Sequence, residues 1–175
     1  MRNKVITALV LTSLFCVSCA HDTADIHAES SASAKYNLSE LKTYAWWGAV
    51  GELYDPNGRW VPTNMDAASE IKWLIDRELR KRGYTEVSQD PELLVTFAVV
   101  VDMEALALVK SHADGSLKVA NIPQGALMVE LLDSETENIV WLGSADAEIR
   151  QYADEDIVKK RLDVAISGMF KGLPK

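Results

Sequence analysis

The sequence has no cysteine beyond its first nineteen residues. Cys16 and Cys19 are the only two in the chain of 175 residues. No disulfide can therefore support a fold in the rest of the chain, and a CxxC metal half-site has no second pair to complete it. A disulfide between Cys16 and Cys19 would close a segment with no fold around it, so we expect the two cysteines to have another role.

Histidine is also scarce, and the common catalytic motifs are absent. The three histidines are His21, His27 and His112. The first two lie near the N-terminus, and the third lies in a polar segment that we predict to be a loop or hairpin. The sequence contains no GxSxG, HExxH, P-loop or GxGxxG pattern. We therefore expect no histidine general base, no cofactor and no enzymatic activity.

Acidic residues outnumber basic residues in this sequence. The chain has 18 Lys and Arg against 26 Asp and Glu, which gives a formal net charge of −8. An acidic chain does not bind nucleic acid nonspecifically, and it gains nothing from an anionic lipid surface. We therefore expect no nucleic-acid partner.

One apolar run stands out, and it is short. Arg2 and Lys4 precede the apolar residues 5–17, and no comparable stretch follows. A membrane-spanning helix needs about 20 apolar residues. A basic start followed by a short apolar segment is typical of a secretory signal peptide, which we place at residues 1–18.

The end of this segment resembles the lipobox of bacterial lipoproteins. The four positions read Cys16, Val17, Ser18 and Cys19, with Cys16 where leucine is usual. The resemblance implies cleavage between Ser18 and Cys19, with diacylglycerol on the Cys19 thiol and a third acyl chain on its amino group. Phe15 is too bulky to suit the position before the cleavage site, which favours Cys19 over Cys16 as the modified residue.

The lipobox also predicts where the protein resides. In Gram-negative lipoproteins, an aspartate after the modified cysteine is the usual signal for retention in the inner membrane, and this chain has Ala20 there. The resemblance therefore implies the periplasmic face of the outer membrane. Cleavage would remove two basic residues and leave 16 against 26 acidic ones, a formal net charge of −10.

The segment after the lipobox consists mainly of small and polar residues. Residues 20–35 read AHDTADIHAESSASAK, with one large aliphatic residue, Ile26. Such a composition buries too little apolar surface to offset the entropy of ordering. We therefore interpret residues 19–37 as the acylated cysteine and a flexible tether. Its histidines and aspartates make a poor metal cage, so we expect no metal site.

Residues 38–175 predict one domain. Residues 41–47 read as a strand, residues 93–103 alternate as a long strand, and residues 125–148 read as a β-hairpin. Two amphipathic patterns predict helices. One contains Ile71, Leu74, Ile75 and Leu79, begins at Asn64 or Asp66, and ends near Gly83, while the other contains Val158, Leu162, Ala165, Ile166 and Met169.

This order predicts an α+β fold, a two-layer sandwich in which both helices pack on one face of a small, twisted, mostly antiparallel sheet. Residues 104–109 are ambiguous, and we interpret them as a continuation of the preceding strand. The next segment, KSHADGSLKVANIPQ, is predicted to be a loop or hairpin.

The order of several short motifs resembles the DUF4136 domain family of envelope lipoproteins. The family's KTYAW, KGY, DPDLLV and LVWRG patterns correspond here to residues 42–46, 81–84, 90–95 and 139–143, with Leu142 in place of the common arginine. Residues 125–133 match a further strand pattern, and residues 170–174 match the proline-terminated end loosely. These motifs are structural, so the resemblance implies a fold and carries no catalytic residue.

Two sets of residues are candidates for function. Trp46 and Trp47 must face opposite sides of a strand. An exposed Trp47 with Tyr54 and Trp60 would form a surface for an envelope protein partner, whereas packing of the loop that contains Tyr54 and Trp60 over this ring would instead complete the core. Asp102 and Glu104, two apart on a strand, are the carboxylate pair that a glycan-cleaving enzyme would need.

The absence of catalytic motifs favours a non-enzymatic binding or assembly module attached to the membrane by lipid. Two alternatives stay open: an enzyme acting on cell-wall glycan, and a lipoprotein that binds a small molecule or lipid between sheet and helices.

Overall fold

Two helices cover one face of a mixed sheet in the computed structural model of the chain, which describes residues 22–47, 52–55, 65–110, 117–150 and 153–174. The elements in these residues are β1 (His27–Ala32), β2 (Thr43–Trp46), β3 (Glu52–Tyr54), α2 (Ala67–Lys81), β4 (Thr85–Glu86), β5 (Leu93–Asp102), β6 (Leu106–Lys110), β7 (Leu117–Asn121), β8 (Gln124–Asp133), β9 (Ile139–Glu148) and α3 (Glu155–Phe170). The α+β sandwich predicted from the sequence is confirmed.

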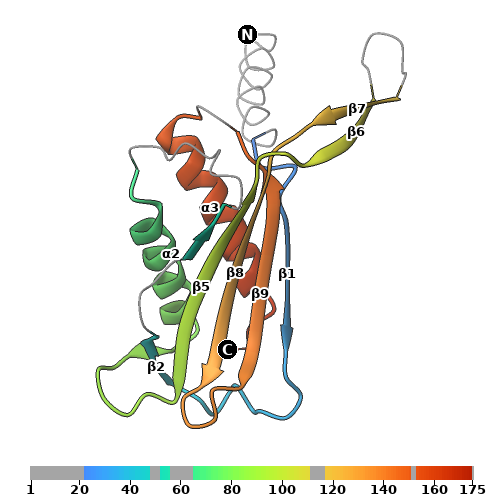
Figure 1. The fold of residues 1–175 in the computed structure, drawn as a ribbon. Helices are drawn as coiled ribbons and strands as arrows, with labels where there is room; N and C mark the ends of the chain where they lie inside the picture. The colour runs from blue at the N-terminus through green and yellow to red at the C-terminus, as the bar shows by residue number, and fades with distance from the viewer. Residues whose placement is uncertain (1–21, 48–51, 56–64, 111–116, 151–152, 175) are drawn as a thin grey trace, which may run out of the picture.

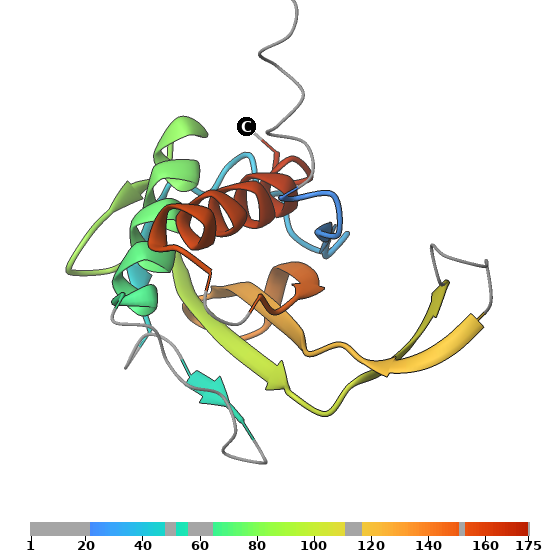
Figure 2. The ribbon, with the colours of Figure 1, turned by 90° about the horizontal axis from the view of Figure 1, so that it is seen from above.

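The main sheet is built around three long antiparallel strands. In the described part of the chain the strands follow the order β1-β9-β8-β5-β2-β4, and β3 pairs with β5 beyond the end of β2. β2 and β3 run parallel to β5, whereas β1, β9, β8 and β5 pair in antiparallel fashion. Figure 2 shows α2 and α3 on the same side of this sheet.

Alternation along the strands places the core between the sheet and the helices. Leu93, Val95 and Phe97 of β5 are buried on the helix side, as is Trp141 of β9. The Trp141 ring lies 4.9 Å from the Phe170 ring of α3, centroid to centroid. The alternating pattern that predicted the long strand therefore identifies its buried face correctly.

The ends of α2 follow the sequence signals. Asp66 is the N-cap, and its carboxylate accepts a hydrogen bond of 3.1 Å from the backbone N–H of Ser69. After the helix, Gly83 has φ +87°, a conformation that glycine adopts at no steric cost. Of the two predicted caps, Asn64 lies outside the described residues.

The predicted tether is wrong for the described residues from 22 onward. Residues 27–32 form β1, the edge strand of the sheet, paired with β9 along its whole length. The small side chains of β1 let α3 approach closely, because a Cβ on Gly168 would lie 2.8 Å from Ala28 and one on Gly172 would lie 2.2 Å from Ser30. Two residues of the segment interpreted as a tether, Ala28 and Ser30, therefore pack closely against Gly168 and Gly172.

The prediction that residues 104–109 continue the preceding strand is also wrong. β5 ends at Asp102, a turn follows at Met103 and Glu104, and β6 pairs with β7 in a separate two-stranded sheet. We call β6 and β7 together the β6–β7 arm. Figures 1 and 2 show it extending away from one end of the main sheet.

Candidate functional site

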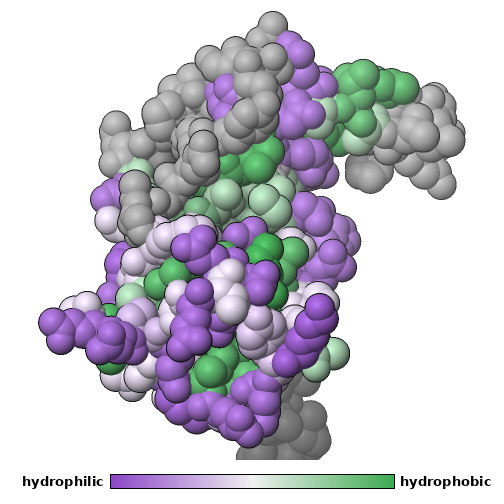
Figure 3. Space-filling view, turned by 60° about the horizontal axis from the view of Figure 1, so that its bottom comes forward, coloured by the Kyte–Doolittle hydropathy of each residue, from purple (hydrophilic) through white to green (hydrophobic). Residues whose placement is uncertain are grey.

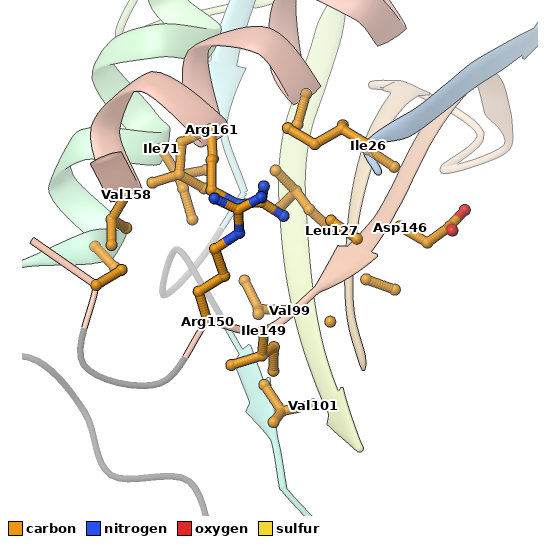
Figure 4. Close-up of a pocket in the computed structure, with 18 of the residues that line it drawn as sticks. Ile26, Ile71, Val99, Val101, Leu127, Asp146, Ile149, Arg150, Val158 and Arg161 are labelled. Carbon is orange, nitrogen blue, oxygen red and sulfur yellow. The ribbon is translucent and has the colours of Figure 1, made fainter. Parts of the chain in front are cut away.

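The two layers separate at one end and leave a cavity of about 440 Å³. It lies where β5 and β9 finish and where β8, α2 and α3 begin. Ile71, Val99, Val101, Leu127 and Val158 line its apolar walls. Figure 4 shows these side chains converging from the sheet below and the helices above.

Small residues explain why the layers leave this space. β8 contributes Gly125 and Ala126 to the wall, β9 contributes Ala145 and Ala147, and α2 begins with two alanines. Interiors are otherwise close-packed, so a row of small side chains between the sheet and the helices leaves a void. The cavity is therefore a consequence of composition at one end of three elements.

A cluster of charged groups closes one side of the cavity. The guanidinium of Arg161 binds both carboxylate oxygens of Asp25, at 2.8 and 2.5 Å, and donates to the carbonyl of Glu148 at 3.0 Å. Arg161 also donates to the backbone carbonyl of Asp22. Arg150 binds Asp22 at 3.2 Å. These bonds attach the beginning of the described chain to α3 and to the end of β9.

The electrostatics of this cluster follow from its geometry. Hydrogen bonds from Arg161 lower the pKa of the Asp25 carboxyl to about 2. Burial by itself would raise the pKa of Asp22, but hydrogen bonds from Arg150 and Lys160 bring it below its usual value. Both carboxylates are therefore charged at neutral pH, and three basic side chains face them.

A second polar cluster lies beneath α2, away from the cavity. The buried Asp76 accepts hydrogen bonds from the Tyr44 hydroxyl at 2.7 Å, from Trp46 Nε1 at 3.0 Å and from Lys72 Nζ at 2.8 Å. Burial, together with the bond to Asp76, raises the pKa of Tyr44 well above its usual value. Because these groups satisfy one another, the cluster holds α2 on β2.

Comparison with known proteins identifies the family. A family model described as "Domain of unknown function (DUF4136)" matches residues 28–175. The chain belongs to the DUF4136 family. No curated protein matches the sequence.

Solved structures show the same fold at low sequence identity. A DUF4136 family protein from Bacteroides thetaiotaomicron is 8% identical, with a TM-score of 0.53 over 82% of this chain and 95% of that chain. A PDZ domain protein from Parabacteroides distasonis is 14% identical, with a TM-score of 0.51 over 98% of this chain. This chain spans 40% of the length of that second protein.

The lipidation and cleavage residues predicted for this DUF4136 protein, Ser18 and Cys19, lie outside the described residues. Within the described part of the chain, no helix has the length and apolar character needed to cross a bilayer.

The aromatic candidates are partly described. Trp46 faces α2, and its Nε1 donates to Asp76 of that helix. Its ring also packs edge-on against Phe97 of β5, at 6.2 Å between centroids. Trp47, the next residue, is 43% exposed, which agrees with the alternation expected of a strand. Tyr54 lies in β3 but its side chain is not described, and Trp60 lies outside the described residues. The structure therefore leaves Trp47 as the described member of the proposed partner surface.

The predicted carboxylate pair is not arranged as we expected. Asp102 ends β5, and Glu104 lies in the turn that follows, so the two do not share a strand face. The Asp102 carboxylate accepts a hydrogen bond of 2.9 Å from the backbone N–H of Glu104. This bond gives Asp102 a structural role in the turn.

Sequence reasoning missed the charged cluster entirely. Asp25 and Arg161 are separated by 136 positions in the sequence, and Asp25 lies in the segment that the composition predicts to be a tether. No local pattern pairs residues so far apart. The cavity itself had a faint signal, the alanines in SADAEI at the end of β9, which alternate onto the helix side of the sheet.

Proposed function

We propose that this DUF4136 protein is a lipoprotein of the outer membrane, facing the periplasm, whose domain is a non-enzymatic module that binds an apolar ligand of the lipid class between its sheet and its helices. The observation that carries the ligand proposal is the apolar cavity of about 440 Å³. Ligand sites in proteins are commonly clefts of about 300–1,000 Å³, lined by apolar side chains with a few polar groups that fix orientation.

The composition of the cavity wall supports a ligand of the lipid class. Most of the lining residues are apolar, from β5, β8, β9, α2 and α3. The polar lining residues carry charges of both signs: Asp66, Asp146, Glu148, Arg150 and Arg161. An aliphatic chain would gain roughly 0.8 kcal/mol for each CH₂ removed from water. A flexible acyl chain suits such a wall better than a sugar or a nucleotide, whose many hydroxyls and phosphates would lose water without finding partners.

The membrane anchor rests on the lipobox. One acyl chain binds a bilayer only marginally and reversibly, whereas two or more make the attachment stable. The three chains expected on Cys19 would therefore hold the acidic domain at the membrane without help from its charge. Replacement of Cys19 by serine should release the protein into the soluble periplasmic fraction, and its continued sedimentation with membranes would contradict the anchor.

The cavity is tested by filling it. Val99 faces the cavity, and Val100, the next residue of β5, faces the opposite side of the sheet. We expect Val99→Trp to lose binding of dodecanoate and of the fluorophore N-phenyl-1-naphthylamine, because the indole would occupy the site. Val100→Trp is the matched control and should bind both probes as the wild type does.

Binding is measured by displacement of the fluorophore with dodecanoate. Dodecanoate should compete with the fluorophore in the wild type, and circular dichroism should show that both variants are folded. If the wild type binds neither probe, or if Val99→Trp binds them as Val100→Trp does, the cavity is not a ligand site.

A second candidate function is an assembly role through Trp47. Its exposure favours this role, because tryptophan is enriched at the energetic centres of protein interfaces. A photo-crosslinking residue at position 47 should capture one specific envelope protein in living cells. The same residue at Ile139, which is 47% exposed at the start of β9 and is not aromatic, is the control. Equal crosslinking from both positions would contradict a specific interface.

A further inference from the structure

The described chain begins very close to the proposed lipid anchor. Asp22 is attached to the domain by its backbone carbonyl, which accepts from Arg161, and by its carboxylate, which binds Arg150 at 3.2 Å and Lys160 at 3.5 Å. Cys19 precedes Asp22 by three positions. An extended chain covers at most about 3.6 Å per residue, so the acylated residue must lie within about 11 Å of Asp22. The domain is therefore not free to move far from the bilayer.

The attachment lies at one particular end of the sheet. The backbone N–H of Glu148 donates to Asp25 at 3.0 Å, Glu148 pairs with Gln124, and Gln124 pairs with Asp102. Neighbouring strands lie about 4.8 Å apart, so this row spans about 15 Å. This row of residues extends across the sheet from Asp25, near the start of the described chain, to Asp102, the last residue of β5.

The β6–β7 arm leaves from the same end. Leu106 begins β6 four residues after Asp102, and the side chain of Asn121, at the end of β7, donates to the carbonyl of Met103 at 3.1 Å. In Figure 1 the blue start of the described chain and the base of the arm lie together at the top of the sheet. The arm therefore begins where the bilayer must be.

The arm has a surface that suits a lipid interface. Leu106 is 71% exposed and Val119 is 64% exposed. Leu106 pairs with Asn121, and Val119 lies two residues before Asn121, so Leu106 and Val119 are diagonal neighbours on one face. Figure 3 shows hydrophobic surface on the described part of the arm, where it projects from a body with much hydrophilic surface.

The charge of the arm differs from that of the rest of the chain. Lys110 and Lys118 are the charged residues of its two strands, which contain no Asp or Glu. The mature chain as a whole would carry a formal net charge of −10. Anionic headgroups repel an acidic protein, but they attract lysines at the surface. The two strands of the arm therefore carry a net positive charge, which favours their approach to such a surface.

We propose that the β6–β7 arm is a second membrane contact, in which Leu106 and Val119 enter the headgroup boundary of the same bilayer that holds the acyl chains of Cys19. The proposal rests on the acylation given under the proposed function. Acylation confines the arm to a thin layer at the bilayer, so a contact too weak to bind from solution is sufficient here. Two contacts, anchor and arm, fix the orientation of the domain and turn the cavity end toward the lipid.

The test uses the acylated protein in vesicles of phosphatidylethanolamine and phosphatidylglycerol that contain nitroxide-labelled lipid. After processing, the Cys19 thiol is acylated, so a cysteine introduced at Leu106 or Val119 is the single site for an environment-sensitive fluorophore. Ile139→Cys is the matched control, since Ile139 is an exposed aliphatic residue at the opposite end of β9. Nine residues of strand place it about 30 Å from Glu148.

We expect labels at Leu106 and Val119 to be quenched several-fold more strongly than the label at Ile139, and to emit at shorter wavelength. Flotation of the same samples reports acylation separately. Protein that floats with the vesicles but shows equal quenching at all three positions would overturn the arm contact and leave the anchor intact. A disulfide-linked dimer formed through Leu106→Cys, without lipid quenching, would also overturn it and would assign the face to a second copy. Protein that does not float would overturn the acylation, and with it the arm contact.

Discussion

The ion pair between Asp25 and Arg161 attaches the start of the described chain to α3. Its geometry is bidentate, and Arg161 is a buried residue. Removing one partner of such a pair costs more than the pair contributes, because the other charge is left desolvated. Arg161 would then face the cavity without its carboxylate.

The pair makes stability depend on pH in the acid range. The Asp25 pKa is about 2 in the folded protein, against 3.8 for the free side chain. A lowered pKa stabilises the fold above the unfolded value, and the contribution is lost as the pH falls from about 4 to about 2. Allowing for solvent screening at a partly exposed carboxylate, we expect about 1–2 kcal/mol at neutral pH.

Urea unfolding of wild type and Asp25→Asn at several pH values measures this contribution. The wild type should be more stable at pH 6, and the difference should shrink to near zero by pH 2. Glu29→Gln, which removes an exposed carboxylate of β1, is the matched control and should follow the wild type. A difference between wild type and Asp25→Asn that stays constant down to pH 2 would contradict the assigned pKa.

Gly143 is a second residue whose identity the structure explains, because its surroundings leave no room for a side chain. A Cβ there would lie 2.5 Å from the Trp141 ring and 3.0 Å from the Cβ of Met169. Overpacking of a core typically costs about 1–3 kcal/mol. We therefore expect Gly143→Ala to lower the free energy of unfolding by this amount, while Ser144→Ala, on the opposite face of β9, changes it little. Equal unfolding midpoints would show that the ring can move aside.

β1 is the element whose role differs most from the sequence-based expectation. Its six residues pair with β9, and cross-strand pairs contribute roughly 0.2–1 kcal/mol each. Replacing residues 27–32 with glycine and serine should therefore lower the free energy of unfolding by about 2 kcal/mol or more. Hydrogen exchange should show that the amides of β9 lose protection. Unchanged stability and protection would restore the interpretation of this segment as a tether.

The elements that sequence predicted correctly are those whose signals are local. The apolar spacing of Ile71, Leu74 and Leu79 defines α2, and strict alternation defines β5. β8 and β9 form a hairpin, so the short turn between them already determines that they pair. In each case, residues close in the chain determine the structure.

The features that sequence missed depend on partners far along the chain. HAESSA becomes a strand because the edge of β9 is free to pair with it and because α3 needs small residues beneath it. The parallel pairing of β2 with β5 places α2 in the connection between the two strands, and no pattern within β2 indicates it. The cavity and the pair formed by Asp25 and Arg161 arise only once these long-range contacts are made. The cavity and this ion pair can therefore be predicted only after the fold is known.

At the scale of the whole molecule, the incorporation of residues 22–32 into the domain changes how a domain anchored through Cys19 would meet a membrane. A tether of residues 20–35 would have let the domain rotate freely, at an r.m.s. distance of about 20–25 Å. With the proposed anchor on Cys19, a spacer of only two residues, Ala20 and His21, would instead hold the cavity, the charged cluster and the arm at the bilayer. The acidic body would then extend away from the lipid, which would reduce its repulsion by anionic headgroups.

Lengthening this spacer tests the orientation directly. A Gly-Ser linker of twenty residues, inserted between His21 and Asp22, adds an r.m.s. reach of about 25 Å and lowers the effective concentration of the arm at the lipid surface. The protein should still float with vesicles, but lipid quenching of a label at Leu106 should fall toward the level at Ile139. The same linker added after Lys175 is the control and should leave quenching unchanged. If quenching at Leu106 is as strong with the inserted linker as without it, the short spacer does not set the orientation of the domain.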